Sequence, residues 1–215
     1  MNTPSPLWIC FALDREARPL RPHLSKLSHA RILVTGMGTR RTQESLEQAL
    51  SLSQPRWLLT CGFAGGLSSR ARIGDVLFET SDSSISNALA HCGAQPGSFH
   101  CASRIAVTSQ EKRELAESTC ADAVEMESAL IRRLCSARGI ASATLRAISD
   151  TAEADLPLDF NQLTGPDEQL SGGKLAIAIL RRPWVIPGLM KLGRNSSLAA
   201  DRLTQCILAA APQLT

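Results

Sequence analysis

Carboxyl side chains stand at places in the sequence that a folded chain would bring together. Glu125 and Glu127 flank Met126 at the start of an apolar helical stretch, and Asp150 follows the strand-like run from Ile140 to Ile148. An acid before a helix and an acid after the next strand meet at one edge of an open α/β sheet, where ligands bind. There they could exchange protons with a ligand. Each acid alone could instead favour a helix start or a turn, so the prediction rests on the set.

The elements that must position these acids follow from the spacing of apolar residues. Gly139 ends the helix that runs from Met126, and Thr108 with Glu111 can form a capping box. The predicted strands are Leu7–Leu13, Arg31–Thr35, Arg56–Cys61, Arg104–Thr108 and Ile140–Ile148. The other predicted helices are Thr42–Leu52, Thr108–Leu115, Lys174–Arg182, Trp184–Leu192 and Asn195–Ala210.

Two further segments follow predicted strands and are candidates for the same edge. Glu16 lies just past the first strand, where it could also be an ordinary acid of a helix first turn. The stretch Gly62–Leu67 follows the third strand and contains Phe63, Ala64 and Gly65. Its glycines would let backbone N–H groups approach a ligand closely, so a ligand-binding loop is predicted.

Composition narrows the class of protein. A chain of 215 residues with 44% hydrophobic residues fits one globular domain. The net charge of +3 comes from dispersed arginines, which does not indicate a nucleic-acid groove. Seven cysteines without a CxxC pair predict a reduced, cytoplasmic protein, and the His91-Cys92 and His100-Cys101 spacing does not predict a metal site. Charged residues end the first apolar run too early for a signal peptide.

The motifs together resemble the nucleoside phosphorylase superfamily, and most closely its methylthioadenosine/S-adenosylhomocysteine nucleosidases. The resemblance is carried by Val124–Glu127, by Arg146–Asp150, by Ala12–Glu16 and by Gly62–Leu67 with the following Gly74-Asp75-Val76. It covers most of the chain except 81–101 and about 174–194. It implies a three-layer α/β/α sandwich around a mixed, partly barrel-like sheet, as a single domain over 1–215.

The resemblance also implies a reaction, the cleavage of the N-glycosidic bond of a purine nucleoside. Asp150, oriented by Ser149, would protonate the base, and Glu16 would activate water. Glu127 would bind the ribose hydroxyls. The remaining residues implied for substrate binding are Met126, Glu125, Gly65, Ala64, Phe63 and, as a stacking partner for the base, Phe160. No cofactor is implied.

The sequence also allows other functions for the same residues. Phosphate could replace water as the acceptor, in which case Arg18, Arg40 and Arg41 are the candidate phosphate ligands. The chain could also be a catalytically silent nucleoside-binding module, because the family's serine in the glycine stretch is replaced by Phe63. The absence of a GxGxxG motif disfavours dinucleotide binding.

The insertion at about 174–194 interleaves apolar residues with Arg181, Arg182, Lys191 and Arg194. That pattern is typical of an interfacial helix, although an ordinary helix pair packed on the domain or on a second subunit fits too. The insertion and the segment Leu156–Phe160 resemble the hopanoid-associated branch of the superfamily, whose implied substrate is adenosylhopane. The short region 81–101 is expected to leave the 5′ end of the nucleoside open to a larger group. A homodimer or higher homo-oligomer, with contact to the inner membrane face, is also expected.

Overall fold

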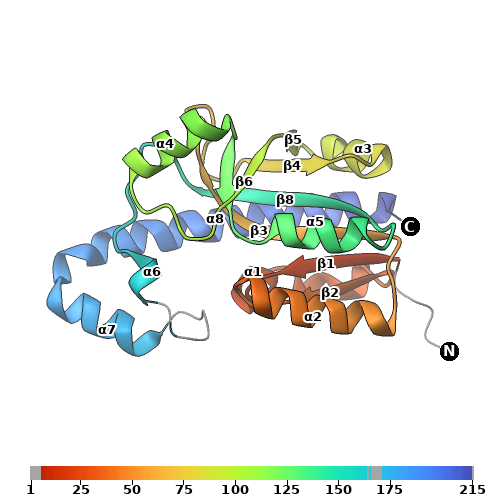
Figure 1. Cartoon of the computed structure of the whole chain (residues 1–215), viewed down its shortest axis with the longest axis horizontal. Helices are drawn as coiled ribbons and strands as arrows, with labels where there is room; N and C mark the ends of the chain where they lie inside the picture. The colour runs from red at the N-terminus through yellow and green to blue at the C-terminus, as the bar shows by residue number, and fades with distance from the viewer. Residues whose placement is uncertain (1–5, 164, 166–170, 215) are drawn as a thin grey trace.

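The computed structural model describes residues 6–163, 165 and 171–214. A sheet forms the centre of the molecule and helices cover both of its faces (Figure 1). The strands are β1 (Leu7–Phe11), β2 (Ala30–Val34), β3 (Trp57–Gly66), β4 (Val76–Thr80), β5 (Gln95–Pro96), β6 (Phe99–Cys101), β7 (Ala123–Glu125) and β8 (Ala141–Asp150). The α-helices are α1 (Asp14–Ala17), α2 (Thr39–Leu52), α3 (Ser83–His91), α4 (Ser109–Thr119), α5 (Ser128–Ser136), α6 (Phe160–Leu163), α7 (Gly172–Arg181) and α8 (Ile186–Ala210), with 3-10 turns η1 (Arg21–Lys26), η2 (Pro183–Val185) and η3 (Ala211–Gln213).

The sheet is mixed, as predicted. Its main path runs β2-β1-β3-β8-β4-β5, and β7 joins β3 and β6 beside that path. The pairs β1/β2, β1/β3 and β3/β8 are parallel, whereas β4/β8 and β3/β7 are antiparallel. Parallel pairing brings the ends of β1, β3 and β8 to one edge. The residues that follow or end these strands therefore lie near one another, as the sequence predicted.

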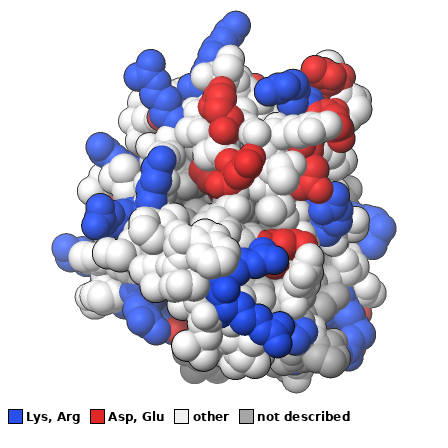
Figure 2. All heavy atoms as spheres, turned by 90° about the vertical axis from the view of Figure 1, so that its left-hand side faces the viewer, with Lys and Arg blue, Asp and Glu red and all other residues white. Residues whose placement is uncertain are grey.

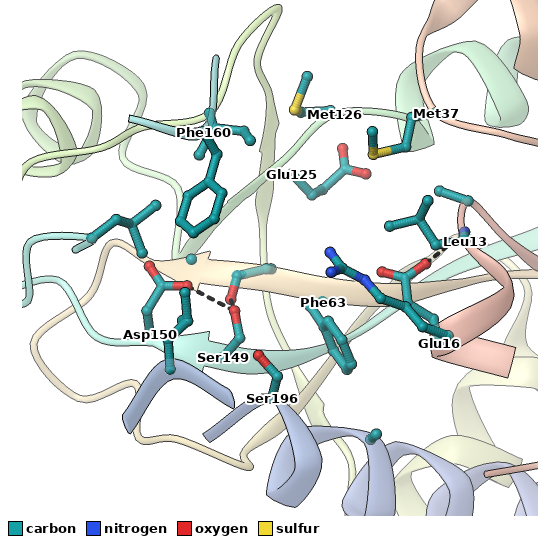
Figure 3. A pocket seen from close by; sticks show the side chains of 18 of the residues that line it. Leu13, Glu16, Met37, Phe63, Glu125, Met126, Ser149, Asp150, Phe160 and Ser196 are labelled. Atoms are coloured by element: carbon teal, nitrogen blue, oxygen red, sulfur yellow. Dashed lines mark hydrogen bonds between the residues drawn. The ribbon is translucent and has the colours of Figure 1, made fainter. Parts of the chain in front are cut away.

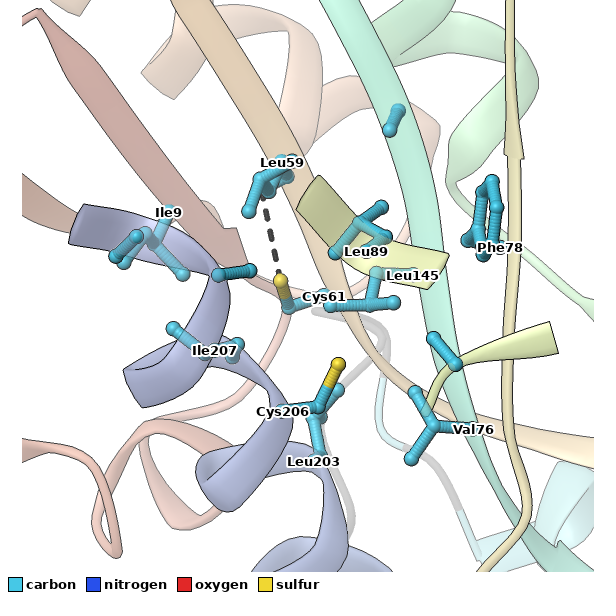
Figure 4. Packing of buried hydrophobic residues seen from close by; sticks show 14 of the residues in the cluster. Ile9, Leu59, Cys61, Val76, Phe78, Leu89, Leu145, Leu203, Cys206 and Ile207 are labelled. Carbon is cyan, nitrogen blue, oxygen red and sulfur yellow. Dashed lines mark hydrogen bonds between the residues drawn. The ribbon is translucent and has the colours of Figure 1, made fainter. Parts of the chain in front are cut away.

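Alternating side chains of the strands face two separate apolar layers. On β1, Ile9 packs in the cluster that contains α8, whereas Trp8 packs in the cluster that contains α2 and α5. Figure 4 shows the first of these clusters, in which Leu203 and Ile207 of α8 lie against the strands. Burial of this apolar surface fixes the sheet and thereby the edge that carries the acids.

The glycine stretch after the third strand is not a loop, which corrects the prediction. β3 continues through Gly62 to Gly66 because β8 pairs with it along this length, with a register shift between Ala64 and Gly65. β7 pairs with Gly65 and Gly66 from the other side. Pairing with β8 along Gly62–Gly65, and with β7 at Gly65 and Gly66, keeps the stretch extended despite the low strand propensity of glycine.

Four other predicted elements differ in the structure. Residues 104–108 form no strand, and the helix predicted to open at Met126 begins only at Ser128, because β7 occupies Ala123–Glu125. The two last predicted helices are one helix, α8, which runs unbroken from Ile186. The capping box of Thr108 and Glu111 at the start of α4 is confirmed.

The insertion at about 174–194 forms α7, η2 and the first turns of α8, a helical hairpin that projects from the sheet (Figure 1). Its inner face packs on the segment after β8 through a small cluster that includes Leu158, Leu163 and Val185. Gly188 of α8 lies so close to Pro157 that an added Cβ would sit 2.9 Å from the proline Cβ. Within the described residues, no helix is both long and apolar enough to cross a bilayer.

Candidate active site

The predicted acids line one cavity of about 620 Å³ at the sheet edge. Glu16 enters from α1, Glu127 from the residues between β7 and α5, and Asp150 from the end of β8. Figure 3 shows the carboxyl groups of Glu16 and Asp150 at opposite ends of the view, with Phe63 and Ser149 between them. Of the other residues predicted to bind substrate, Ala64, Gly65, Glu125, Met126 and Phe160 also line this cavity.

Glu16 lies on a single helical turn directly after β1. Its Oε2 accepts a hydrogen bond of 3.0 Å from the backbone N–H of Leu13, which completes a capping arrangement for α1. Burial raises the pKa of the Glu16 carboxyl, although the Leu13 N–H and the Arg146 charge act in the opposite direction. A buried carboxylate with a raised pKa is a better proton acceptor than an exposed one.

Glu125 has a different environment from the acids Glu16 and Glu127. Its Oε2 accepts a hydrogen bond of 2.7 Å from the fully buried Arg146, and its Oε1 accepts one of 2.6 Å from the Ser128 hydroxyl. Burial works to raise the pKa of Glu125, but Arg146 and Ser128 outweigh it and lower the pKa overall. Glu125 therefore remains ionised and holds the start of α5 against β8, so we regard it as a positioning residue.

Glu127 also lines the cavity, and no cation among the described residues forms an ion pair with it. Burial raises its pKa to about 7, with the nearby Arg146 lowering it and Glu125 and Glu16 raising it. Met126 precedes it, outside α5, and also lines the cavity. The strand β7 explains this placement, because its hydrogen bonds to β3 and β6 hold residues 123–125 extended and stop the helix from starting earlier.

Asp150 has a protein donor on each carboxylate oxygen. The Ser149 hydroxyl donates to Oδ1 at 2.7 Å, as the predicted orienting role requires, and Lys112 Nζ donates to Oδ2 at 2.6 Å. Lys112 belongs to α4, is fully buried, and also donates to the carbonyl oxygens of Thr151 and Ala154. This lysine ties together α4, the end of β8 and the segment that follows.

The glycines of β3 make room for two of the acids. A Cβ at Gly62 would lie 3.2 Å from Oε1 of Glu16, and a Cβ at Gly65 would lie 3.1 Å from Oδ2 of Asp150. Both spacings are tighter than ordinary van der Waals contacts. The absence of a Cβ at these glycines therefore admits the carboxyl groups of Glu16 and Asp150, and the approach of a ligand to their backbone stays a prediction.

The apolar walls of the cavity come from two sources. Phe63 of β3 lies in its floor, and the ring of Phe160, from the start of α6, points toward the space beside Asp150 and Ser149 (Figure 3). The far wall is formed by the hairpin, through Leu175 of α7 and Leu189 and Leu192 of α8. No residue of 81–101 lines the cavity; that region forms α3, β5 and β6 instead.

None of the three predicted phosphate ligands, Arg18, Arg40 and Arg41, lies on the cavity wall. Arg40 forms an exposed ion pair with Glu44 on the surface of α2. The arginines that do line the cavity are Arg15 and Arg104, which were not predicted. In the part of the chain that the structure describes, no group of three or more His, Cys, Asp and Glu side chains is arranged to hold a metal ion, and the seven cysteines are free.

Sequence reasoning assigned no role to Lys112 or Arg146. Arg146 stands in a strand that otherwise reads as apolar, and a charged residue in a buried strand is a signal that it must have a partner. Lys112 gives no such signal, because it stands in a helix rich in charged residues, and only its contacts with Asp150 and the following carbonyl groups distinguish it.

Comparisons with known proteins agree with these motifs. Residues 86–181 match the model of the phosphorylase superfamily, a range that contains Glu125, Glu127 and Asp150 but not Glu16. A search of curated protein sequences finds no match.

Solved structures with the same fold include three nucleoside hydrolases. The methylthioadenosine/S-adenosylhomocysteine nucleosidase of Neisseria meningitidis, in complex with methylthio-immucillin-A, has a TM-score of 0.70 and 15% identity over 95% of this chain and 97% of that one. The corresponding nucleosidase of Colwellia psychrerythraea, in complex with adenine, has a TM-score of 0.70 and 14% identity over 97% and 95%. A futalosine hydrolase mutant of Helicobacter pylori has a TM-score of 0.59 and 17% identity over 67% and 87%. The chain thus carries the sequence pattern of the phosphorylase superfamily over residues 86–181, within the fold of the methylthioadenosine/S-adenosylhomocysteine nucleosidases that its motifs resemble.

Proposed function

We propose that this protein hydrolyses the N-glycosidic bond of an adenine nucleoside that carries a modified 5′ position. The observation that carries the proposal is the convergence of Glu16, Glu127 and Asp150, from three separate elements, on one cavity. Relatives of the same fold bind adenine and methylthio-immucillin-A, which supports a purine nucleoside as the ligand class.

The base lies at the Asp150 end in this proposal. Cleavage moves the electron pair of the C1′–N9 bond onto the purine, and Asp150, which takes up a proton from solvent when the nucleoside binds, neutralises the leaving base by passing that proton to N7. Ser149 and Lys112 hold the carboxyl group in place through its two oxygens, and the Lys112 ammonium stabilises the carboxylate that remains. Phe160, which points into this end of the cavity, stacks on the base.

The sugar lies between Asp150 and Glu16. Glu127 accepts hydrogen bonds from the two ribose hydroxyls and stabilises the positive charge that develops on the sugar ring. Met126 packs on the ring face. Glu16 removes a proton from the attacking water, whose oxygen forms the new bond to C1′, so the products are free adenine and a reducing sugar. Each proton transfer contributes about 10²–10⁴-fold to the rate.

The 5′ group extends toward the hairpin. Leu175, Leu189 and Leu192 line that end of the cavity, which supports an apolar substituent rather than a charged one. Adenosylhopane, the substrate implied by the resemblance to the hopanoid-associated branch, is a nucleoside of this kind. Methylthioadenosine is a smaller one and serves as the first test substrate.

Phosphorolysis of the same nucleosides is the second candidate. Arg15 lines the cavity and is the cation next to Glu16 in sequence, which is the one feature in its favour. Hydrolysis is preferred because a buried carboxylate beside the attack position would repel phosphate, and because the three predicted phosphate ligands are away from the cavity.

Adenine release from methylthioadenosine, measured with and without phosphate, tests the proposal. We expect release without phosphate, a fall of at least about a hundredfold in Glu16→Gln and in Asp150→Asn, and no change in the control Glu153→Gln, whose side chain is exposed and does not line the cavity. A strict phosphate requirement would establish phosphorolysis instead. Nucleoside binding without any adenine release would identify a silent binding module.

A further inference from the structure

The outer side of the hairpin formed by α7, η2 and the first turns of α8 carries an unusual concentration of exposed apolar side chains. Leu180 is 81% exposed and Trp184 is 71% exposed. With Ile177, Ile186 and Met190 they form what we call the hairpin face, which holds most of the exposed large apolar residues in the described part of the chain. A group of this kind on a protein surface marks a contact with another molecule or with a membrane.

The inner side of the hairpin packs against the rest of the domain. Leu175, Ile179 and Leu189 pack with Leu158 and Val185, so the apolar residues on the outside are additional to those needed to attach the hairpin. The close approach of Gly188 to Pro157 fixes the hairpin on the segment after Asp150. The hairpin therefore has two apolar sides, an inner one that is packed on the domain and an outer one, the hairpin face, that is exposed.

The charged residues of the hairpin itself are of one sign. Residues 174–194 contain five cations, Lys174, Arg181, Arg182, Lys191 and Arg194, and no aspartate or glutamate. All five are exposed. Figure 2 views the molecule from the hairpin side, and an uncharged area there is bordered by blue cationic side chains, while the red acidic side chains gather mainly in the upper part.

The exposed apolar residues and the cations beside them favour an anionic lipid surface over a second copy of the chain as the partner of the hairpin face. A second copy of the chain that paired through the same face would bring the five cations of each copy against one another, because a two-fold interface places identical patches in contact. An anionic phospholipid surface instead accepts the apolar side chains among its acyl chains and the cations at its headgroups. We propose that the hairpin face binds the protein peripherally to a bilayer that contains anionic lipid. This proposal does not depend on the reaction that the cavity catalyses.

Co-sedimentation of the full chain with phospholipid vesicles tests the proposal. We expect binding to vesicles of phosphatidylglycerol mixed with phosphatidylcholine, weak or no binding to pure phosphatidylcholine, and loss of binding at high salt. Trp184 provides a second signal, because Trp8 and Trp57 are buried. Its fluorescence should shift to shorter wavelength with the anionic vesicles.

Matched variants separate the apolar and charged contributions. Arg181→Glu/Arg182→Glu and Leu180→Ser/Trp184→Ser should each weaken binding by on the order of tenfold or more, since one cation near an anionic surface contributes roughly fivefold. The controls are Lys26→Glu/Arg70→Glu, the same charge change elsewhere on the surface, and Leu52→Ser, a leucine 77% exposed on α2. Both should bind like the parent chain.

Three results would overturn the proposal. One is an absence of sedimentation with anionic vesicles at low salt, and another is equal binding by the hairpin and control variants. The third is a dimer that Leu180→Ser/Trp184→Ser converts to a monomer in analytical ultracentrifugation, because a second copy would then cover the hairpin face. Thermal unfolding followed by circular dichroism confirms that each variant is folded.

Discussion

Lys112 and Asp150 form an ion pair of 2.6 Å at the end of the candidate active site, with Lys112 fully buried and Asp150 nearly so. The ammonium group also donates to the carbonyl oxygens of Thr151 and Ala154, which uses all three of its protons. A buried charge is tolerated only when it is paired and hydrogen-bonded in this way. The pair therefore fixes the carboxyl group that we assign as the proton donor together with the segment that follows β8.

Replacing Lys112 by methionine should damage both stability and catalysis. Asp150 would lose its cation while remaining largely buried, which costs about 3–5 kcal/mol when one partner of such a pair is removed. Urea unfolding measures the stability, and adenine release from methylthioadenosine measures the activity. The double variant Lys112→Met/Asp150→Asn should recover much of the stability and none of the activity. If Lys112→Met releases adenine as fast as the parent chain, the lysine has no part in the site.

Replacing Gly65 by alanine should slow the reaction while leaving the fold intact. The new Cβ would lie 3.1 Å from Oδ2 of Asp150 and 3.3 Å from Cγ1 of Val124, so the carboxyl group must move by a few tenths of an ångström. A displacement of this size at a proton donor should lower kcat by roughly tenfold to a hundredfold. The matched control is Gly172→Ala in α7, where nothing lies within 4 Å of the added Cβ. Equal kcat values for the two variants would contradict the assigned role of Asp150.

Substrate binding should weaken below neutral pH because of Glu127. Burial raises the pKa of this carboxyl to about 7, so it is ionised above that pH and becomes protonated as the pH falls through it. A protonated carboxyl accepts hydrogen bonds from ribose hydroxyls less well. KM for methylthioadenosine should therefore rise as the pH falls from about 8 to about 6, and Glu127→Gln should have a high KM that no longer depends on pH in this range. A pH-dependent KM in Glu127→Gln would assign the titration to another group.

Removing the ring of Phe160 should raise KM more than it lowers kcat. Stacking of an aromatic side chain on a base contributes about 1–3 kcal/mol, which corresponds to about tenfold to a hundredfold in affinity. Phe160→Ala should show that increase in KM, and Phe160→Tyr should restore binding because it keeps the ring. Steady-state kinetics of adenine release measures both. An unchanged KM in Phe160→Ala would show that the ring serves only to anchor α6 to the hairpin.

The sequence was sufficient to predict the strands β1, β2, β3 and β8 and the edge at which Glu16 and Asp150 lie. The carboxyl ends of parallel strands lie at the same edge of a sheet, so this prediction needs no knowledge of side-chain packing. The extension of β3 through Gly62–Gly66 was not predictable in this way, because neighbouring strands and not local propensity keep it extended.

The parts of the site that depend on distant contacts were missed for the same reason. Lys112 meets Asp150 across 38 residues of sequence. The late start of α5, which frees Met126 and Glu127 to line the cavity, depends on pairing of β7 with β3 and β6. The continuity of α8 from Ile186 overrides the polar residues Asn195, Ser196 and Ser197, which suggest a helix start when read alone.

The most direct test of the central claim is a crystal structure of the Asp150→Asn variant with intact methylthioadenosine. We predict the base beside residue 150 and the ring of Phe160, the ribose hydroxyls within hydrogen-bond distance of Glu127, and Glu16 facing the anomeric carbon from the opposite side. A nucleoside bound outside this cavity, or one whose sugar contacts neither Glu16 nor Glu127, would contradict the claim that these acids act on a single sugar.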